Sequence, residues 1–371
     1  MGIMVGLPSP SGSEKDLQLN FGKNMTVQVE MRAPHLPAEW HMQSGIQLTW
    51  PHAGTDWAYM LQEVQECFVK IAKEIAEREL LLIVTPEPEE VKKQIGTVVN
   101  MDNVRFLKCA TNDTWARDHG AITMIDTGNP SLLDFTFNGW GLKFAAELDN
   151  QITKQAVEAG ALKGQYIDCL DFVLEGGSIE SDGMGTLLTT SECLLSPQRN
   201  GKLNQVEIEE YLKSTFHLQK VLWLDHGYLA GDDTDSHIDT LARFCSTDTI
   251  AYVKCTDEAD EHYEALLAME EQLKTFRTLA GEPYRLLALP MADKIEEDGE
   301  RLPATYANFL ILNEAVLYPT YNQPENDRKA GEVLQQAFPK HQIIGIDCRA
   351  LIKQHGSLHC VTMQYPMGVL K

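Results

Sequence analysis

The chain has 371 residues, a formal net charge of −23 and 43% hydrophobic residues. This length supports a large buried core. The negative charge argues against nucleic acid and anionic membranes as partners, and it suits cationic small molecules. The eight cysteines are scattered without a Cys-x-x-Cys pair, which argues against a zinc ribbon or a redox motif and favours free thiols in the cytoplasm.

In chain order, the hydrophobic pattern begins after a stretch rich in Gly, Ser and Pro. Residues 1–30 lack an apolar signal core and are predicted to be a disordered leader, followed by a single domain at 31–371. Apolar residues spaced by three and four predict an amphipathic helix at 57–75, and a buried strand follows at 80–84. Another strand is predicted at 104–109, and no apolar run approaches membrane-spanning length.

From there the same order returns four times: two strands, a helix and a strand. In the second group, Asn204 with Glu207 three residues later has the spacing of a capping box. The predicted elements are strands 121–125 and 132–137, helix 145–158 and strand 165–170; strands 177–180 and 186–190, a helix after Asn204 and strand 221–224; strands 237–244 and 249–254, a helix around 263–276 and strand 284–289; and strands 306–312 and 315–318, a helix around 330–338 and strand 342–346.

The repeat favours a closed array over two domains. The first helix lacks a leading hairpin and the final strands, from Cys360 on, lack a helix, so we expect the two ends to combine into a fifth unit. Units at a period of roughly 60 residues predict an α/β fold, a five-bladed pseudosymmetric α/β-propeller of ββαβ units. An ordinary α/β sheet is the alternative. Asp118, Glu175, His237 and Cys360 begin the hairpins of their units, so a closed array would bring them to its axis.

The stretch 231–239 carries the densest chemistry, with four carboxylates and an imidazole. If it ends in a strand, period two places His237 and Asp239 on one face, where they form a proton-handling pair. Cys360 offers a thiol nucleophile far downstream. The acidic stretch 231–239 is also compatible with a metal-dependent hydrolase, because clustered carboxylates bind calcium or magnesium. An EF-hand loop, however, would need glycine where Ile238 stands, so no metal ligands are assigned.

Six motifs in order resemble the agmatine deiminase family, a branch of the guanidine-modifying enzymes that have the pentein fold. They are NDTWARDHG at 112–120, NGWG at 138–141, LEGGSI at 174–179, GDDTDSHID at 231–239, PATYANF at 303–309 and LHCVT at 358–362. The chain departs from that family's usual pattern at Ser236, where glycine is common, at 355–358 before the cysteine, and at Ala121, where proline is common.

The resemblance implies hydrolysis of a guanidinium group without a metal or organic cofactor. Cys360 would attack the guanidinium carbon, Asp118 and Asp239 would hold its N–H groups, and His237 would protonate the departing ammonia and then activate water. The cationic substrate would be agmatine, converted to N-carbamoylputrescine and ammonia in polyamine biosynthesis.

Three further residues are candidates for substrate binding. Trp115 either closes over the site or packs in the core. Glu175 either meets the substrate or braces the turn at Gly176. Asp233 is the candidate within the acidic run for the substrate's distal charge.

Other functions stay open on the sequence alone. Deimination of free or peptidyl arginine to citrulline is the nearest alternative, and a non-catalytic propeller that acts as a binding module is another. The sequence also leaves a homodimer open.

Overall fold

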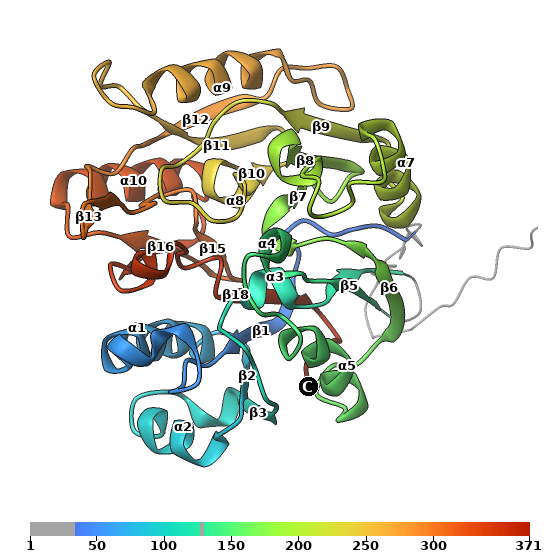
Figure 1. Cartoon of the computed structure of the whole chain (residues 1–371), viewed down its shortest axis with the longest axis vertical. Helices are drawn as coiled ribbons and strands as arrows, with labels where there is room; N and C mark the ends of the chain where they lie inside the picture. The colour runs from blue at the N-terminus through green and yellow to red at the C-terminus, as the bar shows by residue number, and fades with distance from the viewer. Residues whose placement is uncertain (1–33, 127–129) are drawn as a thin grey trace, which may run out of the picture. The chain divides into compact units, whose positions relative to one another are not determined.

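Small mixed sheets dominate the computed structural model, which describes residues 34–126 and 130–371; the leader predicted at 1–30 lies outside them. The described strands form five sheets of three or four strands and one two-stranded ribbon (Figure 1). Each larger sheet contains an antiparallel pair and at least one parallel pair. A helix connects the strands of the parallel pair, because parallel neighbours need a crossover connection. The architecture is therefore α/β with mixed sheets.

One sheet contains strands from both ends of the described chain. Its order is β18 (Thr362–Pro366), β1 (Gln43–Thr49), β2 (Leu80–Thr85) and β3 (Val104–Lys108), with η1 (Asp56–Met60) and α1 (Leu61–Ala76) between β1 and β2, and α2 (Pro88–Ile95) and η2 (Met101–Asn103) between β2 and β3. β18 runs antiparallel to β1, with Leu48 opposite Thr362, whereas β1 and β2 are parallel. The prediction that the chain ends combine into one unit is confirmed, although β1 and α2 themselves were not predicted.

The other four larger sheets follow the predicted order of two strands, a helix and a strand. They are β4 (Ile122–Met124), β5 (Ser131–Thr136), η3 (Asp149–Gln151), α5 (Ile152–Glu158) and β6 (Gln165–Val173); β7 (Ile179–Ser181), β8 (Thr186–Thr190), α6 (Ser191–Leu194), α7 (Gln205–Phe216) and β9 (Lys220–Leu224); β10 (Ala242–Ser246), β11 (Thr249–Lys254), α9 (Tyr263–Thr275) and β12 (Arg285–Pro290); and β15 (Leu310–Ile311), β16 (Ala315–Thr320), α10 (Pro324–Ala337) and β17 (Gln342–Asp347). The ribbon of β13 (Glu296–Glu297) and β14 (Glu300–Arg301) precedes the last of these sheets and was not predicted.

The main helices form where the sequence pattern predicted them. On α1, Val64, Phe68 and Ile71 share one face and are fully buried, as their spacing requires. At the start of α7, the Asn204 side chain accepts hydrogen bonds from the backbone of Val206 and Glu207, and the Glu207 carboxylate accepts one from the Asn204 backbone. The predicted capping box is thus confirmed. In the part of the chain that the structure describes, no helix is long and apolar enough to cross a membrane.

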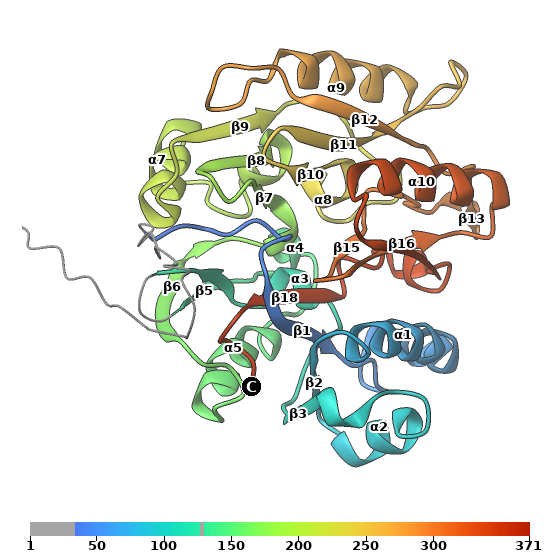
Figure 2. The same cartoon turned by 180° about the vertical axis from the view of Figure 1, so that it is seen from behind.

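Four short helical turns lie at the starts or ends of the sheets, and they carry the predicted chemistry. They are α3 (Ala116–His119), α4 (Gly139–Leu142), η4 (Gly176–Ser178) and α8 (Ile238–Leu241). α3 and α8 both contact η4, and α3 also contacts β18. Figure 2 shows the same arrangement from behind. Residues far apart in the sequence are thereby brought together.

The structure corrects the strand predicted at 237–244. His237 precedes the helical turn α8, and the strand β10 begins only at Ala242. A single buried helical turn followed by a strand cannot be distinguished by periodicity from one longer strand. The predicted strands at 177–180 and 306–312 likewise begin late, at Ile179 and Leu310, and the helix predicted at 145–158 begins at Ile152.

Candidate active site

The Cys360 thiol is buried in the turn that leads into β18. The side-chain oxygen of Asn308 accepts hydrogen bonds from the backbone N–H of His359 at 2.8 Å and of Cys360 at 3.3 Å, and it lies 3.4 Å from the Cys360 Sγ. The Cys360 carbonyl accepts a bond from the Arg117 backbone, which joins this turn to α3. The thiol is therefore held in a fixed position, and Asn308 is a site residue that the sequence analysis did not single out.

Asp118, His237 and Asp239 meet around Gly177. The Asp118 carboxylate accepts the Gly177 N–H at 3.0 Å, and its Oδ1 lies 3.6 Å from His237 Nδ1. Asp239 Oδ2 lies 4.0 Å from the Cys360 Sγ. A β-carbon on Gly177 would stand 2.6 Å from the His237 Nδ1 and 2.8 Å from Asp118 Oδ1, so only glycine leaves room for this arrangement. The structure thus brings together all four residues that the sequence predicted as catalytic.

Two polar atoms of this group have no partner among the described residues. They are the Nε2 of His237 and the Oδ1 of Asp239, and both are buried. Buried polar groups in proteins are normally hydrogen-bonded, and exceptions gather at functional sites. These atoms are available to N–H groups of a ligand or to water.

Burial and carboxylate charge dominate the electrostatics around the Cys360 thiol. Burial and the nearby carboxylates of Asp239 and Asp118 raise the pKa of the Cys360 thiol well above its usual value. Burial and Asp239 likewise raise the pKa of Asp118, whereas burial lowers the pKa of His237 to about 3. Burial also acts to raise the pKa of Asp239, but the hydrogen bond and charge of His359 outweigh it and lower that pKa. A bound cation would favour the ionised forms of the thiol and the carboxylates.

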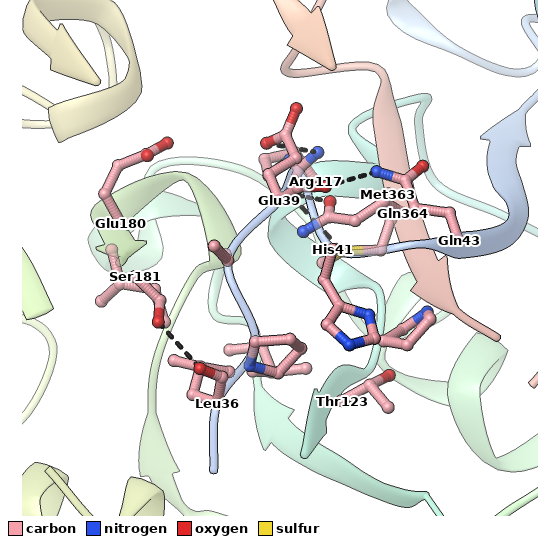
Figure 3. Close-up of a pocket in the computed structure, with 16 residues that line it drawn as sticks. Leu36, Glu39, His41, Gln43, Arg117, Thr123, Glu180, Ser181, Met363 and Gln364 are labelled. Atoms are coloured by element: carbon pink, nitrogen blue, oxygen red, sulfur yellow. Dashed lines mark hydrogen bonds and ion pairs between the residues drawn. The ribbon is translucent and has the colours of Figure 1, made fainter. Parts of the chain in front are cut away.

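A buried charge network supports Asp239 from behind. His359 contacts Asp239 Oδ2 through Nδ1 at 2.8 Å and Glu39 Oε2 through Nε2 at 2.7 Å, and Arg243 pairs with Glu39 at 2.6 Å. Glu39 also lines a small pocket of about 60 Å³ together with Arg117 (Figure 3). The sequence analysis did not identify Glu39, since nothing near it in the chain signals such a partner.

A cavity of about 440 Å³ ends at Cys360 and Asp118. Trp115 and Asp233 also line this cavity. The structure does not bring Glu175 to this cavity: its side chain is fully buried, and both carboxylate oxygens accept hydrogen bonds from Arg199.

The carboxylates of the acidic run mostly stabilise their own loop. Asp232 accepts hydrogen bonds from the Thr234 hydroxyl and the Ser236 backbone, and Asp235 pairs with Lys143 and Arg199. These contacts fix the loop that presents His237.

Within residues 34–126 and 130–371, two groups of three side chains have ligand atoms close enough for a metal ion. They are Glu175, Cys193 and His237, and Glu39, Glu180 and His359. In the first group Arg199 pairs with Glu175, and in the second Arg243 pairs with both glutamates. Each group thus already contains a cationic side chain bound to its carboxylates.

Comparison with known proteins agrees with this geometry. Residues 35–366 match the Porphyromonas-type peptidyl-arginine deiminase family. The chain belongs to that family. A Marinomonas protein provisionally named an agmatine deiminase is 32% identical over 89% of this chain and 94% of its own length.

Solved structures of family members extend the similarity to the fold. A Porphyromonas gingivalis protein provisionally named an arginine deiminase is 51% identical, with a TM-score of 0.86 over 91% of this chain and 100% of its own. A C. jejuni agmatine deiminase variant with substrate bound is 39% identical, with a TM-score of 0.84 over 94% of this chain and 100% of its own. The resemblance to agmatine deiminases expected from the motifs is confirmed.

Proposed function

We propose that the protein is a deiminase that hydrolyses the guanidinium group of agmatine to N-carbamoylputrescine and ammonia. The observation that carries this proposal is the meeting of Asp118, His237 and Asp239 around Gly177, with Asp118 and Cys360 at the end of one cavity and Asp239 4.0 Å from the thiol. A planar guanidinium presents N–H groups along its edges, and two carboxylates are the partners that match them. Nucleophile, proton carrier and guanidinium acceptors are therefore present in one place.

The proposed reaction proceeds through a covalent intermediate. The Cys360 sulfur attacks the guanidinium carbon, and its proton passes to the neutral His237, where the Asp239 charge opposes the effect of burial and favours the imidazolium. His237 then gives that proton to the departing nitrogen, and ammonia leaves a thiouronium group on the sulfur. Water, deprotonated by His237, attacks the same carbon. The C–S bond breaks, the hydroxyl proton of the adduct returns to the thiolate, and His237 gives its proton to ammonia as the ureido product forms. The sum is guanidinium plus water giving a ureido group plus ammonium.

The charge distribution explains how the thiol becomes reactive. In the empty site, Asp118 and Asp239 oppose ionisation of Cys360. A guanidinium between these carboxylates neutralises them and lowers the pKa of the thiol. The nucleophile is thus activated only when a cationic substrate is bound.

Agmatine suits the cavity better than free arginine. Asp113, Asp149 and Asp233 line the cavity beyond Asp118, and Lys143, which also lines it, is paired with Asp235. The α-carboxylate of arginine would meet these acidic groups, whereas an ammonium would be attracted. Relatives and structures named as agmatine deiminases support the same choice.

We also infer that the five sheet units form a five-bladed propeller of the pentein type, with residues 31–371 as one catalytic domain. The support is the repeated strand order and the pairing of β1 with β18. Trp115 and Asp233 would contact substrate from the cavity wall. Glu175, paired with Arg199, would act by supporting this wall.

The test is steady-state kinetics on agmatine, arginine and an arginine-containing peptide, with ureido product and ammonia as readouts. Agmatine should give the highest kcat/KM, and Cys360→Ser should abolish turnover because a serine hydroxyl is far less ionised than a thiol. Cys169→Ser, at a buried thiol on β6, is the matched control and should retain activity. Turnover by Cys360→Ser at more than a few per cent of wild type would refute the covalent mechanism.

A further inference from the structure

The cavity that ends at Cys360 contains a second pair of carboxyl groups, on Asp113 and Asp149. The Asp149 carboxylate accepts the backbone N–H of Asn112 at 2.8 Å and of Asp113 at 3.2 Å. The Asp113 carboxylate accepts the indole N–H of Trp115 at 3.0 Å. Backbone and indole donors therefore hold two acids beside each other and in fixed positions.

These two acids have no cationic partner. Among residues 34–126 and 130–371, no lysine, arginine or histidine forms an ion pair with either, and Asp113 Oδ1 is buried without any hydrogen-bond partner. Burial, and then the charge of Asp56, raises the pKa of Asp113 to about 7. Burial, and then Asp113, raises the pKa of Asp149 to about 7. Burial thus disfavours the ionised form of both acids in the empty cavity, and a bound cation would favour that form.

Aromatic side chains line the same cavity. Trp115, Phe137, Trp140 and Phe144 all face it. The Trp140 ring stands edge-on to Trp115 at 6.1 Å and to Phe144 at 5.5 Å between centroids. Such rings offer apolar surface to a methylene chain and their faces to a cation. A carboxylate beside aromatic walls is a typical ammonium-binding environment.

We propose that Asp113, supported by Asp149, binds the distal ammonium of the substrate, so that the site selects guanidines carrying a second cation at the end of a short apolar chain. This inference rests on the proposed deiminase function. It assigns the binding of the distal ammonium to Asp113 instead of Asp233, which was the residue chosen from the sequence. The Asp233 side chain is 40% exposed, so water already solvates its carboxylate.

The decisive comparison uses two substrates that differ only in the distal charge: agmatine and N-butylguanidine. A hydrogen bond to a charged group contributes enough to predict a kcat/KM for agmatine about 10- to 150-fold above that for N-butylguanidine. Equal kcat/KM values for the two compounds would overturn the subsite while leaving the deiminase function in place. Turnover of neither compound would overturn the proposed function itself.

Variants then show which carboxylate binds the distal ammonium. Asp113→Asn keeps an acceptor for the Trp115 indole but loses the charge, so it should reduce the ratio of the agmatine to the N-butylguanidine kcat/KM to near unity. Urea unfolding and far-UV circular dichroism of the variant show that it is folded. Asp171→Asn is the matched control, because it removes the same charge from an exposed carboxylate on β6. It should leave the agmatine preference over N-butylguanidine unchanged. Loss of the preference in Asp233→Asn but not in Asp113→Asn would overturn the assignment.

Discussion

Replacement of Asn308 by alanine tests whether its amide positions the nucleophile. Asn308 is fully buried, and its oxygen is the acceptor for the backbone N–H groups of His359 and Cys360. A buried N–H group left unpaired costs about 1–3 kcal/mol. The His359 N–H keeps the backbone carbonyl of residue 308 as an acceptor at 3.2 Å, so Asn308→Ala leaves only the Cys360 N–H unpaired. That bond is long, at 3.3 Å, so the lower half of the range applies, and the variant should reduce the free energy of unfolding by about 1–2 kcal/mol. A displacement of the thiol by about 1 Å costs on the order of 100-fold in kcat, with a smaller effect on KM.

The assay pairs urea unfolding with steady-state kinetics on agmatine, and Asn313→Ala is the matched control. Asn313 makes a similar pair of backbone bonds, to the N–H and carbonyl of Gln43, in the loop after β15. Its loss should lower stability and spare kcat, because it does not contact Cys360 or its neighbours. If Asn308→Ala retains a kcat within about threefold of Asn313→Ala, the positioning role is refuted.

Four further variants test the site and the buried acids. Asp118→Asn and Asp239→Asn should each cost more than about 3 kcal/mol in kcat/KM for agmatine, because an amide presents N–H groups to the donors of a cation; near wild-type kinetics would remove that residue from the site. Gly177→Ala should lower kcat by on the order of 100-fold with unchanged far-UV circular dichroism, since the added carbon displaces His237. Burial raises the pKa of Glu79 to about 7, so its ionisation above that pH destabilises the fold. Glu79→Gln should therefore be more stable than wild type at pH 8 by about 3 kcal/mol in urea unfolding, and this gain should disappear as the pH falls to 5.

The sequence predicted the residues of the site better than their geometry. Cys360, Asp118, His237 and Asp239 were identified from motifs, and the structure brings them together. The reason given for pairing His237 with Asp239 was wrong, because α8 is a helical turn and not a strand. Local pattern specifies residue types but does not distinguish one buried turn from a strand.

Long-range polar contacts could not be read from the chain at all. Glu39 and His359 are in contact although 320 residues separate them in the sequence. The strand β1 was not predicted for a related reason. It buries Gln47, whose side-chain oxygen accepts a hydrogen bond from the hydroxyl of Tyr365 on β18. From the sequence alone, a polar residue is predicted to be exposed, because the distant partner that allows its burial is not known.

The pairing of β1 with β18 constrains when the protein can become active. Gln47 and Tyr365 lie 318 residues apart, so the first sheet is completed only after nearly the whole chain has been synthesised. Cys360 precedes β18 by one turn, and Asp118 lies on α3, which contacts that strand. The thiol and its carboxylates therefore assemble only after β18 has been synthesised and paired with β1, and truncation within β18 removes catalysis even though the other four larger sheets retain all their strands.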